Sequence, residues 1–124
     1  MIEPISAEAT RPLRQRVLRP HQTIEQLEYP GDDAPDTLHL GAFKKHTLVG
    51  ITSIYHEAPP GMEDAGSWRL RGVATVPEVR GEGYGERLLC AAIAYVAAQG
   101  GTYLWCHART TVLGFYERYG FQAQ

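Results

Sequence analysis

A chain of 124 residues that is 44% hydrophobic and 21% charged has the size and composition of one soluble domain. Twelve lysines and arginines against 14 acidic residues leave a net charge of −2, so the basic footprint of a nucleic-acid-binding protein is missing. We therefore expect a single domain over residues 1–124 that binds no nucleic acid. No apolar run approaches the about 20 residues that cross a bilayer, and no signal-like apolar core is present, which predicts a cytoplasmic protein without a membrane partner.

The cysteines and histidines do not suggest a metal centre. Cys90 and Cys106 each lie inside an apolar run rather than in a ligand spacing, which favours a reduced chain with buried thiols. The five histidines form no HxxxH or HExxH pair. We therefore expect no metal ion in this protein.

Hydrophobic periodicity predicts short strands interspersed with helices. The expected strands cover residues 2–5, 38–43, 48–55, 68–76 and 102–107, and the expected helices cover 8–18, 85–96 and 111–119, with a helical turn near 24–27. This order predicts a mixed sheet covered by helices, which is an α/β or α+β architecture. Four arginines of the first helix have the spacing of one solvated face, namely Arg11, Arg14, Arg16 and Arg19.

The most informative segment runs from a strand through a glycine-rich turn into a helix. Residues 79–85 read Val-Arg-Gly-Glu-Gly-Tyr-Gly. Three glycines in five residues are costly at a helix start unless the backbone must approach a ligand. Successive amide groups at such a start can cradle a pyrophosphate, and Arg80 would add a charge-assisted contact. The alternative is a tight turn that only shapes the entry to a packed helix.

Spacing narrows the choice of phosphate ligand. Gly81-x-Gly83 is followed by Glu86 where the dinucleotide-binding fingerprint needs its third glycine. The GK[ST] of a Walker loop is absent. Nucleotide enzymes of these two classes are therefore disfavoured.

Two motifs resemble the GNAT superfamily of acyl-CoA-dependent N-acyltransferases. Residues 80–85 match its [QR]-x-x-G-x-[GA] signature, and residues 112–121 resemble its late helix with the FYexxGF ending. The resemblance covers nearly the whole chain and implies an α+β fold of three layers, with a mixed, mostly antiparallel sheet flanked by helices. It also implies an N-acetyltransferase that moves an acetyl group from acetyl-CoA to a primary amine, on a small molecule or a peptide, within a ternary complex.

The same resemblance implies the site residues. The pantetheine arm is expected along the main chain of Val73, Ala74 and Thr75. The CoA pyrophosphate is expected at Arg80 and at the amides of Gly81, Glu82, Gly83, Tyr84, Gly85 and Glu86. Tyr116 falls where many members place the proton donor to the CoA thiolate, the alternative being a tyrosine packed on a core-facing helix stripe. Arg109 stands where members often carry asparagine, and an arginine there would reach the phosphates or the acceptor.

The sequence does not identify the general base. An amine with a pKa near 10.4 is neutral to only about one part in 10³ to 10⁴ at pH 7, so its proton must leave before attack. The candidates are His107, which we take first, and then His56, Glu57 or a water chain. A structural histidine is the alternative reading of His107. Cys106 would suggest a covalent route, but a cysteine alternating within a strand is more often a small core residue.

Two loops and one rival function complete the expectations. Residues 29–37 and 56–67 lean acidic, which is typical of plain solvated loops; the alternative hypothesis is that they select a cationic small amine or polyamine as the acceptor. The missing base and the arginine at position 109 motivate the rival: a non-catalytic acyl-CoA-binding sensor or interaction module with the same fold.

The sequence after the second motif is short. Only four residues follow Gly120, whereas the family continues with a strand and then a further, inserted strand. We therefore expect either a C-terminally truncated chain or a homodimer in which the partner covers an exposed strand edge.

Overall fold

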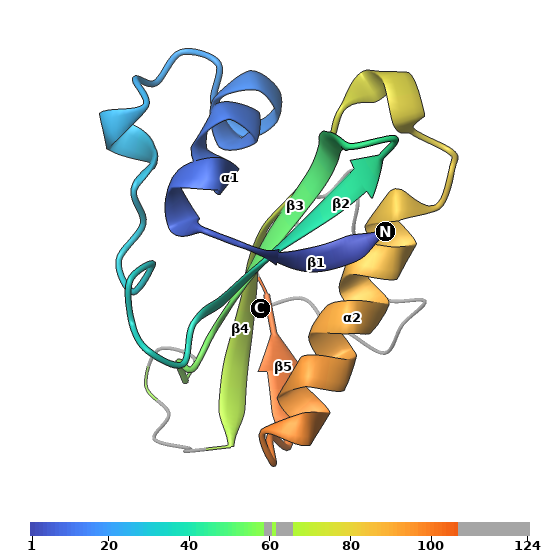
Figure 1. Ribbon diagram of the computed structural model, residues 1–124. Helices are drawn as coiled ribbons and strands as arrows, with labels where there is room; N and C mark the ends of the chain where they lie inside the picture. The colour runs from blue at the N-terminus through green and yellow to red at the C-terminus, as the bar shows by residue number, and fades with distance from the viewer. Residues whose placement is uncertain (59–60, 62–65, 107–124) are drawn as a thin grey trace.

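One five-stranded sheet organises the chain (Figure 1). The computed structural model describes residues 1–58, 61 and 66–106. The strands lie in the order β1-β2-β3-β4-β5 and span Ile2–Ile5, Leu38–Lys44, Thr47–Tyr55, Ser67–Thr75 and Tyr103–Trp105. Neighbours from β1 to β4 pair antiparallel, whereas β5 runs parallel to β4. The predicted mixed, mostly antiparallel sheet is confirmed.

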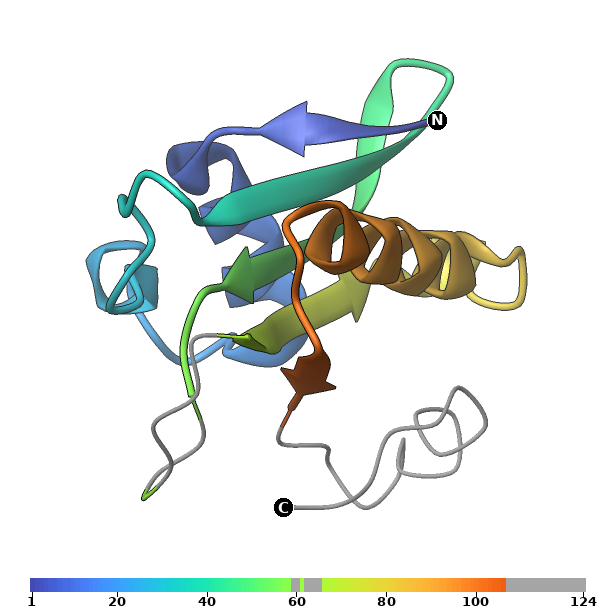
Figure 2. The same cartoon turned by 90° about the horizontal axis from the view of Figure 1, so that it is seen from below.

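Two helices cover opposite faces of this sheet (Figures 1 and 2). Helix α1 spans Ala7–Leu13 and α2 spans Tyr84–Ala98. Arg14, directly after α1, contacts Ser53 of β3, whereas Leu88 of α2 lies against Gly50 of the same strand. Residues three apart on a strand point to opposite faces, so the sheet is the middle of three layers and the α+β prediction is confirmed. Apolar residues of α1, α2 and strands β2 to β4 form one core.

The arginine-rich helix differs from its prediction. Helix α1 ends at Leu13, and residues 14–18 form a π-helical turn. Pro12 sits inside α1 and cannot donate a backbone hydrogen bond, which weakens continuation of the helix. The wider π turn changes the direction of the side chains that follow. Arg14 is fully buried as a result, so the expectation that all four arginines share one solvated face was wrong.

Strand β4 contains a bulge and then loses its outer neighbour. Ile51 of β3 pairs with Ala74 and Ser53 pairs with Arg71, so three steps along β4 oppose two along β3. The extra residue falls at Gly72, whose φ of +70° suits a glycine bulge. Strand β5 pairs only with the first three residues of β4 and lies beside the beginning of that strand (Figure 1). Among the residues that the structure describes, no strand pairs with this edge of β4 beyond Arg69.

Some predicted elements lie outside the described residues. The helix expected at 111–119 is one, and the strand expected at 102–107 is described as β5 up to Trp105. Among the residues that the structure covers, no helix is long and apolar enough to span a membrane. Within the same residues, His, Cys, Asp and Glu side chains form no group of three that could hold a metal ion.

Candidate active site

A glycine-rich loop joins β4 to α2 and is open on its outer side. A 3₁₀ turn at Pro77–Val79 is followed by Gly81 and Gly83, both at φ +87°, a left-handed conformation that suits glycine. A Cβ atom added at either glycine would meet no atom within 4 Å. The backbone of this loop can therefore be approached closely by a ligand.

The same loop presents a row of free backbone donors. Within the described part of the chain, no acceptor is bonded to the N–H groups of Gly81, Gly83, Tyr84, Gly85 and Glu86. Glu82 differs, because its N–H donates to the Val79 carbonyl at 3.1 Å. The free donors precede or begin α2, where the helix dipole is positive. Together they form a surface suited to a phosphate anion.

Two acidic side chains around this loop, Glu78 and Glu82, are paired with cations. Both carboxylate oxygens of Glu78 lie 2.7 Å from Nη2 of Arg16, and a Glu82 oxygen accepts from Lys44 at 2.8 Å. The first contact lowers the pKa of Glu78, and the second raises the pKa of Lys44. Exposed Arg80 reaches back to the Thr75 carbonyl at 3.4 Å. Arg16 and Lys44 therefore compensate the charges of Glu78 and Glu82, whereas Glu86 forms no ion pair among the residues that the structure describes.

The outer edge of β4 presents main-chain groups beside the loop. The Val76 N–H donates to the Val49 carbonyl at 2.9 Å. Hydrogen bonding alternates from residue to residue along an antiparallel pair, so the N–H and C=O groups of Ala74 also point toward β3. The N–H and C=O groups of Val73 and Thr75 point toward the opposite edge. No described strand pairs with that edge after the first three residues of β4. It can accept an extended ligand in the manner of an added strand.

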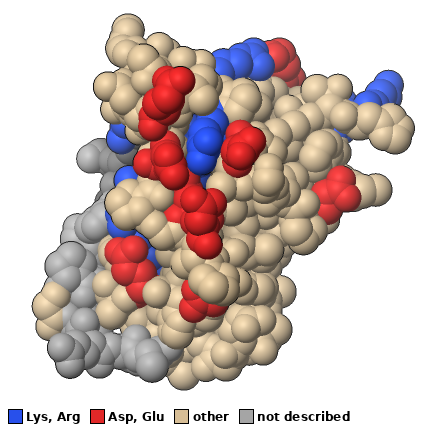
Figure 3. Space-filling model, turned by 60° about the vertical axis from the view of Figure 1, so that its left-hand side comes forward, with Lys and Arg blue, Asp and Glu red and all other residues tan. Residues whose placement is uncertain are grey.

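A hollow of about 450 Å³ lies on the segment between α1 and β2. It is lined by Glu25, Glu28, Tyr29, Pro30, Gly31, Asp32, Asp33 and Ala34. Acidic side chains gather on this face of the molecule (Figure 3). The ring of Tyr29 also reaches β4, since its Cε2 atom would lie 3.8 Å from a Cβ added at Gly72. The acidic hollow therefore adjoins the bulge of β4.

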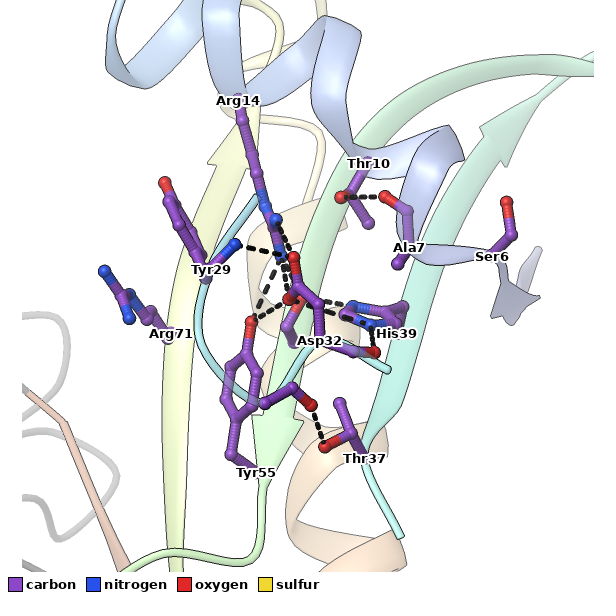
Figure 4. A network of polar contacts seen from close by, with 12 residues as sticks. Ser6, Ala7, Thr10, Arg14, Tyr29, Asp32, Thr37, His39, Tyr55 and Arg71 are labelled. Atoms are coloured by element: carbon purple, nitrogen blue, oxygen red, sulfur yellow. Dashed lines mark hydrogen bonds and ion pairs between the residues drawn. The ribbon is translucent and has the colours of Figure 1, made fainter. Parts of the chain in front are cut away.

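Arg14 and Asp32 form a buried ion pair beside the hollow (Figure 4). Two hydrogen bonds of 2.8 and 3.1 Å join the guanidinium to the carboxylate, and the two side chains are 0% and 1% exposed. The guanidinium also donates, over 2.8 to 3.1 Å, to the Leu27 carbonyl and the hydroxyls of Ser53 and Tyr55. The pair thus ties the segment that lines the hollow to strand β3.

Asp32 is held in its ionised form by its partners. Burial alone raises its pKa, but hydrogen bonds from Arg14, the Tyr55 hydroxyl at 2.6 Å and the Tyr29 N–H at 2.9 Å outweigh burial. The net pKa lies below the ordinary value of 3.8. Burial, with the bond to Asp32 adding to it, raises the pKa of Tyr55. Asp32 is therefore a structural anion at neutral pH and a poor proton acceptor.

His39 extends this network. Its Nε2 lies 2.9 Å from the Asp32 carbonyl oxygen and its Nδ1 lies 2.7 Å from the Ser53 hydroxyl oxygen. A carbonyl oxygen only accepts, so Nε2 carries the proton, and in a neutral ring Nδ1 accepts from Ser53. The hydrogen-bond roles of this buried cluster are therefore mutually consistent.

The described candidates for the general base lie at the far end of β4. His56 stacks on Trp68 with ring centres 4.4 Å apart, and its Nδ1 lies 2.9 Å from the Asp36 carboxylate. Glu57 accepts a hydrogen bond of 3.1 Å from Arg69. Their contact residues, Trp68 and Arg69, belong to the part of β4 that pairs with β5, away from the bulge. Three further predicted site residues lie outside the described residues: His107, Arg109 and Tyr116.

The two cysteines have different surroundings. Cys106 is buried, and burial raises the pKa of its thiol, which agrees with a small core residue. Cys90 lies on α2 and is exposed, so the expectation of two buried thiols was wrong. The apolar run around Cys90 covers both faces of a helix, of which only one is buried.

Sequence reasoning missed the buried polar cluster. Arg14 and Asp32 are 18 residues apart and belong to segments that were each interpreted as solvated. The one local signal is the loop composition around Asp32, which predicts a turn but does not identify a partner. The glycine loop, in contrast, has all its glycines within one short segment, so the sequence alone revealed it.

Comparisons with known proteins agree with this arrangement. The family model for the acetyltransferase (GNAT) family matches residues 3–121. An uncharacterized N-acetyltransferase, YitI of Bacillus subtilis (strain 168), is 39% identical over 121 residues, which cover 98% of this chain and 81% of that protein. The chain belongs to the GNAT family of acetyltransferases, as the sequence motifs predicted, and is an acyltransferase.

Solved structures share the fold at low sequence identity. The aminoglycoside acetyltransferase AAC(6')-Iy, in complex with a CoA-based bisubstrate analogue, superposes with a TM-score of 0.80 at 17% identity, over 98% of this chain and 90% of its own. AAC(6')-IG of Acinetobacter haemolyticus gives 0.79 at 18% identity, over 100% and 92%. These likenesses support the fold, and AAC(6')-Iy has been solved with CoA and with the CoA-based analogue.

Proposed function

We propose that this protein transfers the acetyl group of acetyl-CoA directly to a primary amine while both substrates are bound. The observation that carries the proposal is the row of free amides at Gly81 and residues 83–86, beside the edge of β4 with which no described strand pairs beyond Arg69. CoA contains a pyrophosphate, which suits the free N–H groups, and an extended pantetheine arm with amides, which suits an unpaired strand edge. Val73 and Thr75 supply that edge, with Ala74 between them, and Arg80 adds positive charge.

The proposed step exchanges a thioester for an amide. The neutral amine nitrogen attacks the carbonyl carbon, the C–N bond forms and the C–S bond breaks. Tyr116 is the proposed donor of a proton to the departing thiolate, and Arg109 is proposed to contact the phosphates or the acceptor. The amine proton goes to a base, for which we retain His107, because Asp32 is engaged by Arg14.

The acidic hollow supports a small cationic amine as the acceptor. Glu25, Glu28 and Asp33 line the hollow, which adjoins the bulge of β4 through Tyr29. Negative charge at this place raises the local concentration of a cation. Structural neighbours named for aminoglycosides act on small amines of this kind. A peptide amine is the alternative acceptor.

Thiol release with an amine panel tests the proposed function. The protein is incubated with acetyl-CoA and spermidine, neamine, benzylamine or glutamate, and free CoA thiol is followed over time. We expect acceptor-dependent release, fastest with spermidine or neamine because the hollow is acidic. Turnover with glutamate alone would contradict a cationic acceptor. Acetyl-CoA binding by calorimetry without release for any amine would favour a binding module over an enzyme.

Tyr116→Phe tests the proposed proton donor. Loss of the hydroxyl is expected to lower kcat by about 10- to 100-fold with little change in the affinity for acetyl-CoA, because a departing thiolate then lacks its acid. Steady-state kinetics and calorimetry measure the two effects. Tyr119→Phe, three residues on, is the matched control and should keep its kcat. An unchanged kcat in Tyr116→Phe removes this residue from the mechanism.

A further inference from the structure

Tyr29 is held in a position that ordinary loop packing does not explain. Its ring lies between two guanidinium groups, with Cζ of Arg14 4.0 Å and Cζ of Arg71 3.9 Å from the ring centre. Its backbone N–H donates to the Asp32 carboxylate at 2.9 Å. Three separate contacts therefore fix one partly exposed tyrosine.

The place that Tyr29 occupies joins two parts of the proposed site. Its side chain lies 3.8 Å from the Cβ position of Gly72, at the bulge of β4. The same residue lines the acidic hollow. The ring of Tyr29 therefore borders both the hollow and the bulge of β4.

The surroundings of the ring determine what chemistry it can offer. Guanidinium groups lie near the ring centre from Arg14 and from Arg71, so the aromatic faces are already engaged by cations. The hydroxyl points away from the Asp32 carboxylate (Figure 4) and has no hydrogen-bond partner among the residues that the structure describes. The hydroxyl is therefore the group that remains for an incoming molecule.

We infer that Tyr29 determines acceptor specificity, through a hydrogen bond from its hydroxyl to a polar group of the amine substrate. This inference rests on the proposed acetyl transfer. Arg14, Asp32 and Arg71 are positioning residues, because they hold the ring but do not reach the acceptor. A phenol hydroxyl both donates and accepts, so the substrate class is a small amine that carries a second amino or hydroxyl group.

Tyr29→Phe separates this role from a structural one, because it keeps the ring between the two arginines and removes only the hydroxyl. The matched control is Tyr103→Phe, at an exposed tyrosine that begins β5. Kinetics use whichever of spermidine and neamine gives the higher kcat/KM, and vary that amine and acetyl-CoA in turn. We expect KM for the amine to rise about 5- to 10-fold, since one hydrogen bond is lost, with KM for acetyl-CoA and Tm unchanged. The control should leave both KM values unchanged.

Three results would overturn the inference, and they are distinguishable. If the wild-type protein acetylates the amine and Tyr29→Phe keeps its amine KM within twofold, the hydroxyl does not contact the acceptor and the proposed function still stands. If the wild-type protein releases no thiol with any amine, the inference fails together with the proposed function. A Tyr29→Ala variant that changes Tm but not the amine KM would assign the ring to packing alone.

Discussion

Replacing Asp32 by alanine is expected to lower the free energy of unfolding by about 3 to 5 kcal/mol, or Tm by about 10 to 20 °C. The substitution leaves the fully buried guanidinium of Arg14 without its anion. It also removes the acceptor of the Tyr55 hydroxyl and the Tyr29 N–H. Breaking a buried pair on one side costs far more than the pair contributes in place, because a desolvated charge remains.

Chemical denaturation measures this effect, and the next residue supplies its control. Asp33 is exposed, and Asp33→Ala is expected to change the free energy of unfolding by no more than about 0.5 kcal/mol. If both variants lost the same free energy of unfolding, the stability would depend on the negative charge of the segment rather than on the buried ion pair.

The pH dependence of stability gives a second measurement on the same pair. The folded-state pKa of Asp32 lies below its ordinary value of 3.8. Its ionised carboxylate therefore contributes fully to the stability of the fold above pH 3.8, and this contribution is lost as the pH falls through the lower, folded-state pKa. The wild-type protein should lose this part of its stability in acid below about pH 4, whereas Asp32→Asn should lack it. Parallel acid profiles for the two proteins would contradict the pKa direction.

Gly83→Val is expected to weaken acetyl-CoA binding by about 100-fold. Gly83 has φ +87° and open space above its Cα, so a branched side chain would occupy the place that we propose for a CoA phosphate. Loss of two charge-assisted hydrogen bonds at about 1.5 kcal/mol each corresponds to a change of this size. Calorimetry with acetyl-CoA measures the dissociation constant directly.

The control for this prediction is Gly100→Val, at the opposite end of α2. Gly100 has φ +77° and likewise no atom within 4 Å of an added Cβ, so the backbone strain is closely matched. Both variants should lose similar stability, but only Gly83→Val should lose affinity for acetyl-CoA. Unaltered binding in Gly83→Val, or equal loss in both, would discard the assignment of residues 81–86 as the pyrophosphate site.

The parts of the fold that local sequence determines were predictable. Alternation of apolar residues located the hairpin of β2 and β3, and the change to a helical period after Gly85 located α2. The glycine loop was predictable for the same reason, because the positive φ values at Gly81 and Gly83 are a property of single residues. The order of these elements then limited the topology to a mixed sheet.

The parts that tertiary contacts determine were not predictable. Arg14 is buried because a π turn redirects it toward an acidic residue 18 positions away, and no local pattern contains that contact. The bulge at Gly72 depends on the register of β4 against β3, which the residues of β4 alone do not specify. The adjacency of the hollow and the bulge follows from both, so the position of Tyr29 required the structure.

Anchoring of the segment before β2 by Arg14 affects how an acceptor would bind. The conformational entropy of this segment is lost when the chain folds rather than when the amine arrives. If the amine binds in the hollow as proposed, the wall of the hollow is present before either substrate arrives, and the amine does not depend on acetyl-CoA to create its contacts. An enzyme built in this way is expected to accept its substrates in either order and to discriminate among amines by the shape of a preformed surface.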